Sequence, residues 1–291
     1  MILAIVGPTA VGKTKMSVML AKKYNAIVVN CDAMQVYRDL NIGTAKITEE
    51  EKEGVEHFLF DIKNVSEDYS IFDYQKDVRN LIERYKDRNI IFVGGTGLYL
   101  KSALYDYDLE KESERKDYSQ YSNEELYELA KEKDINCDIH PNNRVRLERF
   151  LDKSKIEHRE PKKLYDHLII GLTLDRDVLY DRINKRVDIM IRDGLLDEVK
   201  YFYDKKEYSK PLINGIGYKE LYEYFDGKVS LEEAIDNIKK NSRHYAKRQY
   251  TFFNHQLDVN WFNVNLDNFD ETYHEVVEFI DSNKENYEKY N

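Results

Sequence analysis

The stretch "GPTAVGKT", residues 7–14, decides the fold of this chain because it fits the phosphate-loop pattern G-x-x-x-x-G-K-[ST]. The apolar run "ILAIV" at 2–6 precedes it and a helical pattern begins at Lys13, so the loop joins a strand to a helix, as the pattern requires. In such a loop, backbone N–H groups and the helix dipole bind an anion, the lysine adds positive charge and the last hydroxyl can bind magnesium. The motif therefore predicts a phosphate or pyrophosphate site, with Thr14 as a magnesium ligand, formed by Gly7, Pro8, Thr9, Ala10, Val11, Gly12, Lys13 and Thr14.

Apolar runs alternate with helical segments beyond this loop. Runs typical of buried parallel strands occur at 26–30, 90–93, 168–175 and 258–264. The segment "YQKDVRNLIERYKD", just before the run at 90–93, has apolar residues at helical spacing. Strands that alternate with helices predict an α/β fold, here a P-loop parallel sheet flanked by helices.

The stretch between Tyr105 and His167 interrupts this alternation. It is rich in Glu, Lys, Tyr and Asp, and it holds two helix-like runs, near 123–133 and 142–152, without a strong strand. We therefore predict a smaller all-helical insertion domain, whose C-terminal edge could extend to about residue 210. The predicted parts are a first core part at 1–112, the insertion at 113–164 and a second core part at 165–291.

Length and composition indicate a soluble enzyme of one or two domains, since 291 residues with 42% hydrophobic side chains bury a sizeable core. Residues 1–7 are too short and lack the basic residues for a signal peptide, and no stretch approaches the ~20 apolar residues of a membrane span. We therefore expect a cytoplasmic protein without membrane contact. Cys31 and Cys137 lack metal-ligand spacing, so we expect reduced thiols and no structural zinc.

The phosphate loop does not define the reaction. A nucleotide hydrolase usually carries an Asp at the end of a neighbouring strand, but the run at 90–93 leads into "GGTGLY" at 94–99, which has no carboxylate. The run at 26–30 delivers Asp32 to the sheet edge where ligands of open α/β sheets bind. Asp32 is therefore a ligand of magnesium or water, or a base for an attacking group, with a surface-loop Asp as the alternative.

Seven blocks of sequence occur in a fixed order along the chain: "GPTAVGKT" (7–14), "NCDAMQVYRDLNIGTAK" (30–46), "GGTGLY" (94–99), "HPNNRVRLERFL" (140–151), "LYDRINKRVDIMIRDGLLDEV" (179–199), "GIGYKEL" (215–221) and "RHYAKRQYTFF" (243–253). Together they resemble the tRNA dimethylallyltransferase family, also called tRNA isopentenyltransferases, and the resemblance covers the chain from residue 7 to about 261. The parts around Asp32, at 43–46 and at 246–251 are specific to this family, whereas the phosphate loop is shared with kinases.

The resemblance implies alkyl transfer rather than phosphoryl transfer. The loop would hold the pyrophosphate of dimethylallyl diphosphate, with Mg²⁺ and Arg186 as further ligands. The five-carbon group would pass to N6 of the adenosine immediately 3′ of the anticodon in tRNAs reading U-initial codons. An exocyclic adenine amine is a poor nucleophile that needs a proton acceptor. By resemblance, Asp32 is that general base and Thr96 lines the reaction channel.

An adenine inside a folded anticodon loop must leave its stack before it can react. The acidic total, 55 acidic against 45 basic residues, points away from nucleic acid, but net charge does not describe a local basic face. "SLEE" at 230–233 predicts a capping box that opens a long helix, and this helix carries a basic run at 239–249. By resemblance, the tRNA anticodon stem-loop would contact Asp32, Ala33, Met34, Gln35, Arg144, Arg146, Lys219, Arg243, Lys247, Arg248 and Gln249.

Three positions depart from the family pattern. Asn143 stands where an acid is common, and Phe252 and Asn254 stand where Trp and a basic residue are frequent. These departures put a contact with the tRNA at each position in doubt. The competing readings are an adenylate prenyltransferase or a P-loop kinase acting on a free small molecule, and a nucleotide-dependent RNA-binding switch without chemistry. We expect the protein to be a monomer.

Overall fold

The computed structural model describes residues 1–107, 109, 116–153 and 161–288. The chain forms two compact units, one of Met1–Tyr105 with Lys163–Asn291 and the other of Asp106–Lys162. The sequence placed the second unit at 113–164, and position 113 lies outside the described residues. The chain from Lys163 to about 210 belongs to the first unit, so the helices after the insertion are part of the core.

The first unit is built on one parallel sheet, which confirms the predicted α/β class. Its strand order is β3-β2-β4-β1-β5-β6, so β1, which leads into the phosphate loop, lies in the interior of the sheet between β4 and β5. The short strand β3 is absent from the sequence prediction because its two residues are only half-buried and form no apolar run. The strands are β1 (Ile2–Val6), β2 (Ala26–Asn30), β3 (His57–Phe58), β4 (Asn89–Val93), β5 (His167–Thr173) and β6 (Asn260–Asn263).

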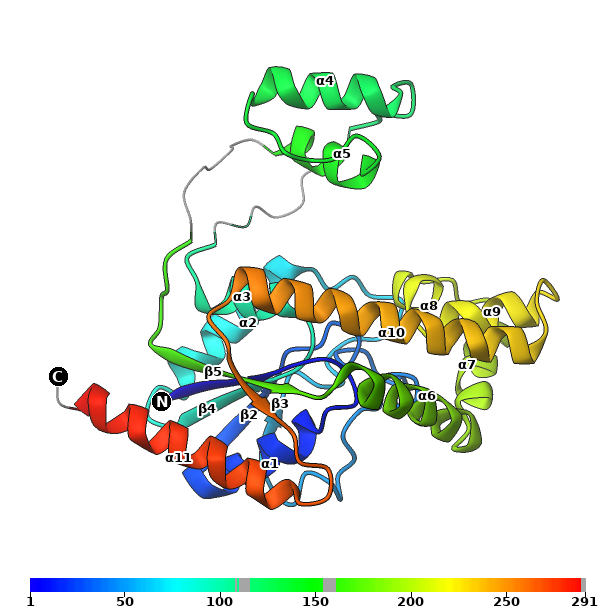
Figure 1. Ribbon diagram of the computed structural model, residues 1–291. Helices are drawn as coiled ribbons and strands as arrows, with labels where there is room; N and C mark the ends of the chain where they lie inside the picture. Colours follow the sequence, from blue (N-terminus) through cyan, green and yellow to red (C-terminus); the bar gives the residue numbers. More distant parts are fainter. Residues whose placement is uncertain (108, 110–115, 154–160, 289–291) are drawn as a thin grey trace. The chain divides into compact units, whose positions relative to one another are not determined.

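Helices cover both faces of this sheet (Figure 1). One face carries α1 (Lys13–Tyr24) and α11 (Phe269–Glu288), and side chains such as Leu3, Ile5 and Met16 form the core between them. The other face carries α2 (Ile71–Arg84), α3 (Gly97–Leu104) and the long α10 (Leu231–Gln256). Four further helices follow β5 beyond the carboxyl ends of the strands: α6 (Arg176–Arg192), α7 (Leu195–Asp204), α8 (Lys210–Asn214) and α9 (Tyr218–Phe225).

Local sequence explains where several of these helices begin. Ser230 accepts a hydrogen bond from the Glu233 amide and the Glu233 carboxylate accepts one from the Ser230 amide, which confirms the capping box predicted for α10. The sequence predicts one helix from Arg176 to about Asp204, but Gly194 adopts a left-handed conformation (φ 105°) and separates α6 from α7. This break turns α7 towards α9.

The second unit is a small helical pair. It contains α4 (Asn123–Lys133) and α5 (Arg144–Asp152), which pack Leu126, Ala130 and Leu147 into a common core. Cys137 lies in that core and Cys31 lies in the first unit, and both are buried free thiols as predicted. Every helix in the described part of the chain is too short or too polar to cross a lipid bilayer.

Candidate active site

The phosphate loop connects β1 to α1 through left-handed backbone. Gly7 (φ 138°) and Gly12 (φ 100°) have positive φ angles, and Ala10 (φ 69°) does too. A Cβ on Gly7 would lie 2.4 Å from the carbonyl oxygen of Leu172, so this position needs glycine. Successive turns of this kind before a helix N-terminus form the concave nest of amides that binds anions.

Two basic side chains, Lys13 and Arg186, lie beside this loop. Burial, followed by the charge of Arg186, lowers the pKa of Lys13 to about 7, and Asp32 acts in the opposite direction. Burial, followed by the nearby Arg182, also lowers the pKa of Arg186, and Asp32 again opposes the shift. Lys13 Nζ donates to the carbonyl of Pro8 at 2.7 Å. Paired cations in a buried site attract a multivalent anion, and one carboxylate balances only part of their charge.

Asp32 is fixed at the exit of β2 by a buried asparagine. Asn30 is fully buried, its Oδ1 accepts from the Asp32 amide at 2.9 Å, and its Nδ2 donates to the carbonyls of Asp32 and Leu59, both at 3.0 Å. Asp32 Oδ1 accepts from the Met34 amide at 2.9 Å. Because these bonds set the turn, the second carboxylate oxygen of Asp32 has a defined position.

The turn 94–97 packs directly against this strand exit. A Cβ on Gly94 would lie 2.2 Å from the backbone carbon of Cys31, so only glycine permits the approach. Thr96 Oγ1 accepts from the Ala33 amide at 3.1 Å, and the Thr96 amide donates to the Cys31 carbonyl at 3.0 Å. The Thr96 side chain therefore supports the segment that carries Asp32.

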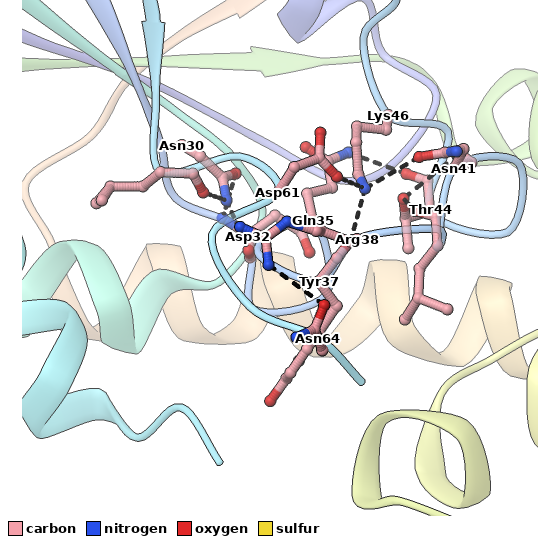
Figure 2. Close-up of polar contacts among 12 residues, drawn as sticks. Asn30, Asp32, Gln35, Tyr37, Arg38, Asn41, Thr44, Lys46, Asp61 and Asn64 are labelled. Atoms are coloured by element: carbon pink, nitrogen blue, oxygen red, sulfur yellow. Dashed lines mark hydrogen bonds and ion pairs between the residues drawn. The ribbon is translucent and has the colours of Figure 1, made fainter. Parts of the chain in front are cut away.

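The segment after Asp32 is held by a second network (Figure 2). Lys46 Nζ donates to the Tyr37 carbonyl at 2.7 Å and pairs with Asp61 at 2.5 Å. Gln35 Nε2 donates to the Thr44 carbonyl at 2.9 Å. Gln35 also lines the cavity described below.

Glu198 of α7 holds the same loop from the outside. Its Oε2 accepts from the amides of Asn41 (3.0 Å) and Ile42 (2.8 Å). Its Oε1 accepts from the Gly43 amide (3.0 Å) and the Tyr218 hydroxyl (2.6 Å). A carboxylate with four donors is a strong local constraint on the loop.

These elements surround one cavity of about 1080 Å³ at the carboxyl ends of the strands. The phosphate loop, the segment after β2, α6 and α10 all contribute to its lining. It brings together predicted residues that lie up to 240 positions apart in the chain: Thr9, Ala10, Gly12, Lys13, Thr14, Asp32, Met34, Gln35, Arg186, Arg248 and Gln249.

The basic helix α10 presents only part of its predicted basic face to solvent. Lys247 and Arg248 are exposed, and the Arg248 guanidinium lies 5.6 Å from the Tyr245 ring centroid. Arg243 is half-buried and donates to Asn184 at 2.6 Å. Gln249 is 4% exposed and both ends of its amide bond to the chain.

Three predicted RNA contacts, Arg144, Arg146 and Lys219, lie outside α10 and differ in their surroundings. Arg144 donates to the carbonyls of Tyr118 (2.6 Å) and Tyr121 (2.8 Å) and to the Asn123 side chain (3.3 Å), and it pairs with Glu148, so it connects α5 to the start of α4. Arg146 is exposed on α5. Lys219 lies 3.7 Å from the buried Glu220 carboxylate.

The structure also places the three residues that depart from the family pattern. Asn143 is the N-cap of α5 without a side-chain cap bond, Phe252 lies against the turn at Gly97, and Asn254 is exposed.

Sequence reasoning missed four residues that shape the site, namely Asn30, Lys46, Arg182 and Glu198. Asn30 carried a usable signal, because a polar residue that ends an apolar strand must find partners when it is buried. Lys46 binds Tyr37 and Asp61 in its own part of the chain, whereas Arg182 and Glu198 act on segments far away, as when Glu198 binds amides at 41–43. No local pattern predicts such a contact.

Comparison with known proteins identifies the relatives of the chain. The family model described as IPP transferase matches residues 35–256. The tRNA dimethylallyltransferase of Bacillus licheniformis is 46% identical over 284 residues, which cover 90% of each chain. That of Halalkalibacterium halodurans is 44% identical over 301 residues, which cover 96% of each chain.

Solved structures give the same answer. The crystal structure of the full-length tRNA isopentenylpyrophosphate transferase of Bacillus halodurans is 44% identical, with a TM-score of 0.79 over 99% of this chain and 98% of that one. A eukaryotic dimethylallyltransferase captured acting on tRNA is 28% identical, with a TM-score of 0.83 over 97% of this chain and 79% of that one. The resemblance seen in the sequence is thus confirmed, and the chain belongs to the tRNA dimethylallyltransferase, or IPP transferase, family.

Proposed function

We propose that this protein transfers a dimethylallyl group from dimethylallyl diphosphate to N6 of the adenosine immediately 3′ of the anticodon, in tRNAs reading U-initial codons. The observation that carries the proposal is the cavity itself, in which an anion-binding loop and a carboxylate at a strand exit face the same space. Membership of the family supports the assignment.

The phosphate loop would stabilise the leaving group. As the allylic C–O bond breaks, negative charge develops on the diphosphate. Lys13, Arg186 and the loop residues Ala10 and Gly12 line the same cavity, so they would stabilise this charge in the transition state with little reorganisation. Binding of the diphosphate would also restore the pKa of Lys13 towards its ordinary value, because an anion favours the charged amine.

The donor set fits magnesium at the first turn of α1. Thr14 offers a hydroxyl oxygen, which is a hard ligand of the kind Mg²⁺ prefers, and it lines the cavity. Among the described residues, no group of three or more His, Cys, Asp or Glu side chains is placed to hold a metal ion. The ion would therefore be held by Thr14 together with diphosphate oxygens, and it would supply further positive charge to the leaving group.

Asp32 would act as the general base. The adenine amine has a delocalised lone pair, so its attack on the allylic carbon requires removal of a proton. The Asp32 carboxylate lines the cavity with one oxygen bound to the Met34 amide, and the other oxygen is free to accept that proton. Gln35 lies on the same segment and would bind the edge of the extruded base.

The tRNA would bind across the exposed part of α10. Arg248 lines the cavity, Lys247 is its exposed neighbour on α10, and both would contact phosphates, while Arg146 is a candidate contact in the second unit. Such a partner fits a cytoplasmic enzyme, and we propose that it acts as a monomer.

The main rivals are an adenylate prenyltransferase and a P-loop kinase, both acting on free small molecules. The test incubates the protein with Mg²⁺ and radiolabelled dimethylallyl diphosphate, with either unmodified tRNA or AMP as acceptor. The proposal predicts label in tRNA alone, recovered as a modified adenosine after digestion to nucleosides. Label in AMP would support the first rival, and phosphate transfer from ATP without any prenyl transfer would support the second.

A further inference from the structure

Gln249 bridges two loops of the active site from α10. Its Oε1 accepts from the Thr9 amide at 3.1 Å, and its Nε2 donates to the Gly95 carbonyl at 3.0 Å. The side chain is buried, and its amide is engaged at both ends by the backbone. A side chain engaged in this way is poorly placed to recognise an RNA base or phosphate, although it belongs to the basic run predicted to bind tRNA.

The Thr9 amide lies in the strained part of the phosphate loop. The next residue, Ala10, has a φ of 69°, a left-handed conformation that is unfavourable for a non-glycine residue and persists only where the surroundings fix it. Arg182 Nε donates to the Ala10 carbonyl at 3.0 Å from the α6 side. Two consecutive loop residues are thus held by side chains of two different helices, α6 and α10.

At the other end of the bridge, Gly95 leaves room for the Gln249 amide. A Cβ on Gly95 would lie 2.0 Å from Gln249 Nε2, so the absence of a side chain at 95 makes the space for this amide. The adjacent Thr96 supports the segment of Asp32 through the Ala33 amide. Gln249 therefore connects the diphosphate side of the cavity with the side that holds the general base.

We infer that Gln249 is a positioning residue for the diphosphate cradle and not an RNA contact. It holds the Thr9 amide and the left-handed turn at Ala10 in the conformation that receives a diphosphate, and it anchors this loop to the turn at 94–97. The same helix presents Lys247 and Arg248 to solvent, so one rigid element serves both substrates. The inference rests on the proposed function for the identity of the ligand, but binding of inorganic diphosphate tests it without any transfer reaction.

The test compares Gln249→Met, which keeps the length of the side chain without its polar atoms, with the wild-type protein. Isothermal titration calorimetry measures binding of inorganic diphosphate with Mg²⁺, and fluorescence anisotropy measures binding of an anticodon stem-loop. We expect Gln249→Met to weaken diphosphate binding about tenfold or more, because the Thr9 amide loses the partner that fixes the loop. Binding of the stem-loop should stay within about twofold, since the exposed cations are untouched. Asp236→Ala, exposed on the same helix, is the control and should change neither affinity.

Two results would overturn the inference. One is diphosphate binding by Gln249→Met equal to that of the wild type, and the other is a selective loss of stem-loop binding. If Gln249→Met does not fold, hydrogen exchange of the wild-type protein provides the test. The Thr9 amide should be protected from exchange before any ligand is added. Exchange at the rate of an open loop would contradict the hydrogen bond between Thr9 and Gln249. Absence of transfer to tRNA with these binding results intact would count against the proposed function only.

Discussion

The carboxylate of Glu198 offers the sharpest test of how the substrate loop is held. It accepts four hydrogen bonds, from the amides of Asn41 (3.0 Å), Ile42 (2.8 Å) and Gly43 (3.0 Å) and from the Tyr218 hydroxyl (2.6 Å). Glu198→Ala removes all four acceptor contacts at once. The loop it releases carries the Thr44 carbonyl that holds Gln35, so stability and transfer should both suffer.

The size of the effect follows from the number and setting of these bonds. Hydrogen bonds to a charged group contribute about 1.5–3 kcal/mol each, but water can reach the exposed Asn41 amide and replace part of the loss. We therefore expect Glu198→Ala to lower the free energy of unfolding by about 2–4 kcal/mol. Tyr218→Phe removes one of the four donors and should lower it by about 1 kcal/mol.

The assay is urea unfolding followed by circular dichroism, together with single-turnover transfer to tRNA. Asp197→Ala is the matched control, because this neighbouring acid is exposed in the same first helical turn, and its effect should stay within about 0.5 kcal/mol. The stability of Glu198→Gln should be closer to that of Glu198→Ala than to that of the wild type, because the NH₂ group of glutamine cannot accept hydrogen bonds from the amides that Glu198 binds. Equal stability of Glu198→Ala and Asp197→Ala would refute the reasoning.

The remaining predictions concern the chemistry and the strand exit. Asp32→Asn should lower the transfer rate by about 10²–10⁴, the usual contribution of a general base, while the tRNA affinity measured by anisotropy stays within a few-fold. Lys13→Ala should raise the KM for dimethylallyl diphosphate and lower kcat, because Lys13 stabilises both the bound diphosphate and its developing charge; a change in KM alone would contradict this. Binding of tRNA should weaken steeply with salt, with a log-log slope equivalent to several phosphates, and a flat slope would remove the role of α10. Gly94→Ala should destabilise the protein by about 1–3 kcal/mol, because its Cβ would lie 2.2 Å from the Cys31 backbone carbon, and an unchanged melting temperature would exclude that contact.

Sequence alone predicted the parts of the fold that have a local signal. The phosphate-loop motif predicts a strand before it and a helix after it. The apolar runs predicted five of the six strands of the sheet. The two residues of β3 gave no such run, and the break at Gly194 was missed because a glycine inside a helical pattern is often tolerated. Asp32 could be placed at the ligand edge of the sheet from its position after a strand.

Tertiary contacts set the rest of the site, which the sequence could not reveal. Gln249 was grouped with the basic run because of its neighbours, whereas its setting depends on Thr9, 240 residues earlier. Arg144 likewise lies in a basic stretch, but four partners inside the second unit engage its guanidinium. Charge on a helix is visible in a sequence, but what each charge faces is decided by packing.

The most direct test of the central claim measures the products of one turnover. The protein is incubated with Mg²⁺, unmodified tRNA and labelled dimethylallyl diphosphate, without ATP, and both inorganic diphosphate and label in tRNA are counted. If the loop binds the leaving group of an alkyl transfer, one diphosphate is released for each modified adenosine, and Asp32→Asn slows both products equally. A requirement for ATP, or diphosphate release without label in tRNA, would contradict the account.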